Sequence, residues 1–219
     1  MTKHKPYLTH QRQEILSLLT ITMLTPQILA FTGISKNLRS AQKMLRSLRK
    51  AGLIAAYTYK TAKGSKKFYY RNDVPHEIKY HEIKSGLLVH DSITAVFLCR
   101  LFQYGVSKNL TLRFHPPFPL QGKVADGAVT VMQENSVLQT MLLESDTGTH
   151  DHQEIAEKLA AYLPFLTGTD SRIILFLVPG TKRAANLRQL FPEAQRVWFI
   201  SPTDASTELL EHLVFGLKQ

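Results

Sequence analysis

The first third of the chain contains three stretches in which hydrophobic residues recur every three or four positions, the spacing of an amphipathic helix. These stretches predict helices over residues 10–19, 26–33 and 35–50. Thr9 is a suitable N-cap for the first helix, and Gly52 marks the end of the third. One apolar stripe of the third helix is expected to face a core, and it comprises Leu38, Ala41, Leu45 and Leu48.

After Gly52 the pattern changes to one typical of strands. Residues 53–59 and 68–70 predict two strands, and residues 60–67 form a lysine-rich turn between them. Residues 45–54 resemble the end of the recognition helix in many bacterial winged-helix proteins. Three helices followed by a hairpin predict a winged helix, in which the third helix enters the major groove and the hairpin tip contacts phosphate.

The rest of the chain follows a different order. A polar stretch ending in Pro75 predicts a boundary between domains over residues 1–75 and 76–219. Beyond it we expect helices over residues 78–104, 152–166, 182–190 and from 207, and strands over residues 110–114, 128–132, 137–143, 172–178 and 196–200. Strands in succession followed by alternating helices and strands predict an α/β domain with a mixed sheet, in a chain that is α+β overall.

Charge is distributed unevenly along the chain. Residues 1–75 hold 14 Lys and Arg against 2 acidic residues, a net charge of +12, whereas the remainder carries −2. A basic half joined to a nearly neutral one indicates a polyanion-binding module attached to a second unit. A solvated basic surface without a partner is the alternative.

Cysteine content and hydropathy exclude several classes of protein. The single cysteine, Cys99, excludes an internal disulfide framework and a cysteine-based zinc site. The longest apolar runs are far shorter than a membrane span, and no apolar stretch follows the N-terminus as in a signal peptide. We therefore expect a cytoplasmic protein without membrane contact.

The basic module supplies the candidate DNA contacts. Lysine and arginine side chains would mostly contact phosphates, while short polar side chains, including that of Gln42, would reach base edges. The residues expected to contact duplex DNA are Lys36, Asn37, Arg39, Ser40, Lys43, Arg46, Lys50, Lys60, Lys63, Lys66 and Lys67. A winged helix that binds another protein is the alternative.

Acidic residues flank two expected strands of the second domain. Asp126 precedes one strand, and Glu144 and Asp146 close the next, two positions apart and so on one face. Three carboxylates at a sheet edge would suit Mg²⁺ or Mn²⁺, which can activate water against a phosphodiester. Lys158, in the following helix, could reach the same edge and stabilise the transition state.

The order of helix, three strands, helix and strand resembles that of the PD-(D/E)xK nucleases. The resemblance implies catalytic and metal-binding roles for Asp126, Glu144 and Asp146, with Lys158 as a lysine moved to the helix. The sequence departs from the motif at Ala125, where proline is usual, and at Asp146, where lysine is usual. The acids could instead be capping and turn residues, because residues 146–149 also read as a turn.

Four short motifs resemble those of the replication-relaxation family, which has a winged-helix region before them. They are Leu-Val-His-Asp at 88–91, Ala-Asp-Gly at 125–127, Glu-Ser-Asp-Thr-Gly-Thr at 144–149 and Lys-Leu-Ala-Ala-Tyr at 158–162. The residues that match are His90, Asp126, Glu144, Asp146, Lys158 and Tyr162. His90 could simply anchor its helix by a hydrogen bond, and Tyr162 could be a core residue with a tethered hydroxyl.

The family resemblance implies an accessory factor encoded on plasmids or integrative elements and linked to DNA relaxation, replication or conjugative mobilisation. We therefore expect a sequence-directed protein that binds duplex DNA and works with a relaxase or a replication initiator, with a homodimer if the target is an inverted repeat. Two alternatives stay open. One is a metal-dependent endonuclease or nickase, and the other is a transcriptional regulator whose second domain dimerises.

Overall fold

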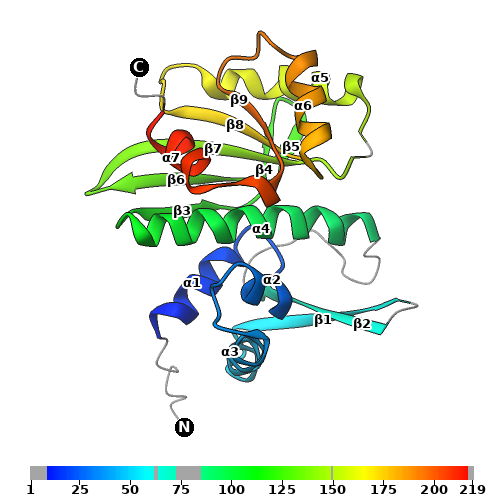
Figure 1. Ribbon diagram of the computed structural model, residues 1–219, viewed down its shortest axis with the longest axis vertical. Helices are drawn as coiled ribbons and strands as arrows, with labels where there is room; N and C mark the ends of the chain where they lie inside the picture. The colour runs from blue at the N-terminus through cyan, green and yellow to red at the C-terminus, as the bar shows by residue number, and fades with distance from the viewer. Residues whose placement is uncertain (1–8, 62–63, 73–84, 149, 217–219) are drawn as a thin grey trace.

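The computed structural model describes residues 9–61, 64–72, 85–148 and 150–216. It confirms a mixed α/β chain, in which a bundle of helices with a two-stranded hairpin precedes a five-stranded mixed sheet (Figure 1). No helix in these ranges has the length and apolar character that a membrane crossing requires.

Three helices open the fold: α1 (His10–Leu18), α2 (Pro26–Phe31) and α3 (Leu38–Lys50). Their starts are fixed by side-chain caps at α2 and α3, where Thr25 accepts a hydrogen bond from the Ile28 amide and Asn37 accepts one from the Ser40 amide. The cap at Asn37 makes α3 begin three residues later than the hydrophobic pattern predicts.

The apolar stripe of α3 is buried at Ala41, Leu45 and Leu48, as predicted. The prediction is wrong for Leu38, which is 41% exposed. Leu38 is the first residue of the helix, directly after the cap, and the core does not extend to that end.

A hairpin of β1 (Ile54–Thr61) and β2 (Gly64–Arg71) follows α3, so the predicted order of three helices and a hairpin is present. Tyr69 of β2 also exchanges two backbone hydrogen bonds with Leu24, at 2.8 and 3.0 Å, just before α2. This bridge fixes the hairpin against the helices.

The second part begins with the long helix α4 (Ser85–Ser107), where a single helix occupies the described part of the stretch predicted over residues 78–104. The sheet has the strand order β3-β6-β7-β8-β9. Its members are β3 (Thr111–His115), β6 (Gly127–Gln133), β7 (Ser136–Ser145), β8 (Arg172–Leu177) and β9 (Val197–Ile200). The first three strands pair antiparallel, whereas β7, β8 and β9 pair parallel.

Helices cover both faces of this sheet. On one face lie α4 and α7 (Thr207–Phe215); on the other lie α5 (His152–Tyr162), the 3₁₀ turn η2 (Leu163–Leu166) and α6 (Thr181–Leu190). The short turn η3 (Pro202–Asp204) connects β9 to α7. A small hairpin of β4 (Phe118–Leu120) and β5 (Lys123–Ala125) was not predicted, because its three-residue strands show no clear alternation.

The hydrophobic core crosses the predicted domain boundary. One cluster of buried side chains runs from Ile15 and Leu45 through Phe97 on α4 to Leu175 of the sheet. Figure 1 shows α4 lying between the sheet and the N-terminal helices. The residues that follow Asn72 at the predicted boundary lie outside the described ranges, and the division into two domains stays a prediction.

Candidate functional site

The first candidate site is the solvent face of α3. Lys36, just before the helix, and the five cations of α3 are all exposed, and no acidic residue occurs anywhere in residues 15–72. The burial of Ala41, Leu45 and Leu48 turns these cations outward, because core and solvent faces alternate with the helical repeat. The five are Arg39, Lys43, Arg46, Arg49 and Lys50.

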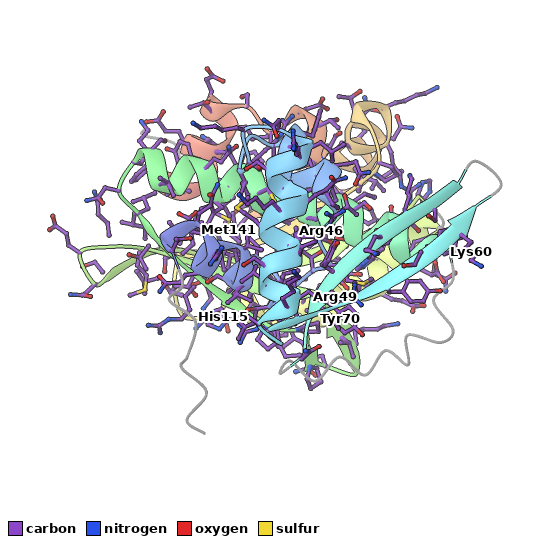
Figure 2. All side chains as sticks on the ribbon, turned by 90° about the horizontal axis from the view of Figure 1, so that it is seen from below. Arg46, Arg49, Lys60, Tyr70, His115 and Met141 are labelled. Atoms are coloured by element: carbon purple, nitrogen blue, oxygen red, sulfur yellow. The ribbon has the colours of Figure 1, made fainter. Side chains whose placement is uncertain are left out.

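The hairpin extends this basic surface beside the helix. Figure 2 shows α3 and the β1–β2 hairpin side by side on one face of the molecule, with Arg46 and Arg49 on the helix and Lys60 near the hairpin tip. Lys66 and Lys67 on β2 are exposed as well. Lys63, also predicted to contact DNA, lies outside the described residues.

Asn37, Ser40 and Gln42 are the short polar residues predicted to reach base edges, and Asn37 has a structural role as well. The side-chain oxygen Oδ1 of Asn37 accepts a hydrogen bond from the Ser40 amide at 2.9 Å, so this side chain caps α3. Gln42 lines a shallow hollow of about 550 Å³ along α3, together with Ser47 and the neighbouring cations. Gln42 therefore lies on the basic surface, whereas Asn37 marks its N-terminal end.

The second candidate site lies where β7 ends, at the sheet face covered by α5. Lys158 of α5 donates a short hydrogen bond from Nζ to Oε1 of Glu144. The Tyr162 hydroxyl, one turn further along the helix, lies 2.7 Å from the other carboxylate oxygen, Oε2. Lys158 thus reaches the sheet edge as predicted, and both oxygens of Glu144 accept hydrogen bonds.

The chemistry of Glu144 is set by its burial. Its side chain is 2% exposed, and this burial, followed by the nearby Asp126 carboxylate, raises the pKa of Glu144 to about 7, although Lys158 and Tyr162 act to lower it. Burial and then the Glu144 carboxylate raise the pKa of Tyr162 far above its ordinary value. The tyrosine hydroxyl is therefore a hydrogen-bond donor that stays protonated, which agrees with a tethered core residue and does not suit a nucleophile.

Asp126 joins the same edge from the β5–β6 junction. Its Oδ2 accepts the Ser145 amide at 2.6 Å and lies 2.8 Å from Nε2 of His90 on α4. The Ser145 hydroxyl in turn lies 2.5 Å from that of Thr94, also on α4. His90 thus has the anchoring contact considered from the sequence, and the edge is tied to helices on both faces of the sheet.

Asp146 belongs to a separate network. Its side chain is 1% exposed and receives hydrogen bonds from the Arg183 guanidinium of α6 and, at 2.8 Å, from the Gly148 amide. His150 Nδ1 lies 3.2 Å from its Oδ1. The contact with Gly148 is that of a turn, as the alternative interpretation of residues 146–149 predicted, although Thr149 itself lies outside the described residues.

These contacts bear on the predicted Mg²⁺ or Mn²⁺ site. Glu144 is neutralised by an ammonium group, and Asp146 by a guanidinium group in a different network. Within the described ranges, no group of three or more His, Cys, Asp and Glu side chains is arranged to hold a metal ion. The arrangement does not fit a three-carboxylate metal site, which stays a prediction from the sequence.

Several members of these networks were not predicted. Ser145 stands between two acids, and strand alternation would have placed it on the opposite face, toward α4. Thr94 and Arg183 carry no such signal, because only the packing of α4 and α6 brings them to the sheet.

Comparison with known proteins adds no relative. No protein-family model matches the chain, and no curated protein matches it.

Proposed function

We propose that this chain binds duplex DNA through a winged helix formed by α1, α2, α3 and the β1–β2 hairpin. The observation that carries the proposal is the exposed basic face of α3, which lies beside a lysine-bearing hairpin in a segment without acidic residues (Figure 2). Phosphate contacts supply most of the affinity of such proteins, so a continuous cationic surface is their main requirement.

The dimensions of α3 suit this role. Its 13 residues span about 20 Å at a rise of about 1.5 Å per residue, and the major groove, about 12 Å wide, admits an α-helix. With α3 in the groove, the hairpin beside it would reach the flanking phosphates. Arg46, Lys43 and Gln42 line the hollow along α3, and we expect them to make this contact.

The role that we propose is that of an accessory protein of a mobile element. The resemblance of four short motifs to those of the replication-relaxation family supports it, and it implies a relaxase or a replication initiator as partner. The hydrogen bonds of Glu144 with Lys158 on α5, and of Asp126 with His90 on α4, would then hold the second part of the chain rigid, because they tie these helices to the sheet. If the target is an inverted repeat, light scattering should show a dimer.

Duplex binding is tested by fluorescence anisotropy across a salt series with Arg46→Ala and Lys67→Ala. Each change should weaken binding to all sequences and reduce the slope of log K against log salt by about 1, because one phosphate contact is lost. Lys182→Ala on α6, an exposed lysine outside the basic surface, is the matched control and should change neither quantity. Equal behaviour of all three variants would refute the proposal.

The metal-dependent endonuclease is the second candidate, because Asp126, Glu144 and Lys158 meet at one sheet edge in a helix–strand order like that of PD-(D/E)xK nucleases. Incubating supercoiled plasmid with the protein and Mg²⁺ or Mn²⁺ tests it. Because Asp146, the third carboxylate of the predicted metal site, is held by Arg183 in a separate network, we expect no nicking. Nicking that disappears in Glu144→Ala would favour the endonuclease instead.

A further inference from the structure

A row of polar side chains crosses the sheet on the face that α5 and η2 cover only in part. Strand register pairs Arg113 of β3 with Thr130 of β6, Thr130 with Thr140 of β7, and Thr140 with Arg172 of β8. Residues paired directly across strands point to the same face. The row therefore has two threonines in the middle and an arginine at each end, roughly 14 Å apart for three strand spacings.

An open groove lies over the middle of this row. Its volume is about 420 Å³, within the usual range of about 300–1,000 Å³ for ligand sites. Thr130 and Thr140 belong to its floor, and Phe118 of β4 and Phe165 of η2 line it from elements that flank the sheet. Both rings are only partly buried, so Phe118 and the side of Phe165 that does not face Arg172 offer aromatic surface to a ligand.

The polar side chains that line the groove are His115, Thr130 and Thr140, and the two arginines lie outside this lining, at the ends of the row. The Arg172 guanidinium lies 5.3 Å from the Phe165 ring centroid, and it donates to the carbonyl oxygens of residues 165 and 167. His115 Nε2 lies 3.0 Å from the Thr130 hydroxyl. Burial, and then the charge of Arg113, lower the pKa of His115, so the imidazole is neutral near pH 7 and the positive charge is confined to the arginines.

We propose that this groove binds a short segment of single-stranded DNA, with bases stacked on Phe118 and Phe165 and phosphates held by Arg113 and Arg172. Aromatic stacking surfaces combined with cations along the path of the backbone are the features by which proteins hold single strands without sequence preference. The backbone positions of the two arginines are roughly 14 Å apart, which corresponds to about four nucleotides at the spacing of about 3.4 Å that a strand has in duplex DNA.

The choice of occupant rests on the proposed function, since a protein bound to duplex DNA meets a single strand where that duplex opens. The groove itself is independent of α3, because none of its residues belongs to the basic surface. It lies on the same sheet face as Glu144, four residues along β7 from Thr140, or about 13 Å. Glu144 therefore lies to one side of the path between the two arginines, which crosses the strands.

Anisotropy of a short fluorescein-labelled oligothymidylate with the full chain tests the proposal. Phe165→Ala should weaken binding about 5- to 150-fold, the range for loss of one stacked base. Arg113→Gln, at an exposed position, should weaken binding and reduce the salt slope by about 0.7, the value for one single-strand phosphate. The matched control Lys182→Gln removes one exposed charge elsewhere and should leave affinity and slope unchanged.

Two further readouts separate this proposal from duplex binding. Arg46→Ala should weaken duplex binding and leave single-strand binding intact, so each proposal can fail without the other. Photocrosslinking of an oligonucleotide carrying 5-iodouracil should label Phe118 or Phe165. The proposal is overturned if the oligonucleotide does not bind, if Arg113→Gln behaves like Lys182→Gln, or if crosslinks fall only on α3 and the hairpin.

Discussion

The buried carboxylate Glu144 should make the stability of the fold depend on pH. Its pKa is raised from the ordinary value of 4.5 to about 7, chiefly by burial. The folded protein therefore binds this proton more tightly than the unfolded chain does. The stability that protonated Glu144 contributes is complete below pH 4.5 and is lost as the pH rises through 7. Over that interval it amounts to about 3 kcal/mol, at about 1.36 kcal/mol for each pH unit.

Glu144→Gln isolates this contribution, because glutamine keeps the shape of the side chain and does not titrate. Urea unfolding of both proteins between pH 4 and about 8 gives the difference in unfolding free energy, variant minus wild type. We expect the difference to rise by about 3 kcal/mol as the pH increases. The contributions of groups that titrate alike in both proteins cancel in this difference.

Glu157→Gln on the exposed side of α5 is the control. The hydrogen bond from Lys123 lowers the pKa of Glu157, so its stability contribution appears above the ordinary pKa and is lost as the pH falls. The control difference should therefore change slightly in the opposite direction. If the Glu144→Gln difference stays flat or falls with rising pH, the ion pair with Lys158 outweighs burial and the reasoning is refuted.

Three other perturbations test local features, each by thermal or urea unfolding or by thiol chemistry. Gly127→Ala should lower the free energy of unfolding by more than about 1 kcal/mol, because φ is +151° and a Cβ would lie 2.8 Å from a β3 carbonyl oxygen. The control Gly168→Ala, where φ is positive but no atom lies within 4 Å of the added Cβ, should lower it less. Equal losses in the two variants would contradict this account. Asn37→Ala removes the cap of α3 and should lower the free energy of unfolding by about 1 kcal/mol. Thr9→Ala, at an N-cap without a side-chain hydrogen bond, should leave it almost unchanged. Cys99 is fully buried, and its pKa is raised to about 12. Ellman's reagent at pH 8 should therefore react with this thiol only after unfolding. Rapid reaction of the native protein would show that the thiol is accessible.

Much of the fold follows from local pattern. The apolar run over residues 172–178 predicts a strand, and residues 172–177 form the buried strand β8. The stripe of Ala41, Leu45 and Leu48 fixes which face of α3 is inward, and so which cations are outward. These features depend on periodicity and solvent exclusion, which are properties of neighbouring residues. Leu38 was misassigned because it is the first residue of α3, directly after the Asn37 cap, and the core does not extend to that end of the helix.

The sites were set by tertiary structure. Spacing suggested that Glu144 and Asp146 act together, yet α5 supplies Lys158 to one and α6 supplies Arg183 to the other. Which helix covers which part of a strand is decided by long-range packing.

Strand register likewise decides the row from Arg113 to Arg172, since residues 59 positions apart meet on one face only through the pairing of four strands. A shift of one residue would turn each side chain to the opposite face. The sequence alone therefore determined the elements and the charge of their exposed faces. The combination of residues in each site arose only when those elements packed, because side chains distant in the chain become neighbours through register and helix placement.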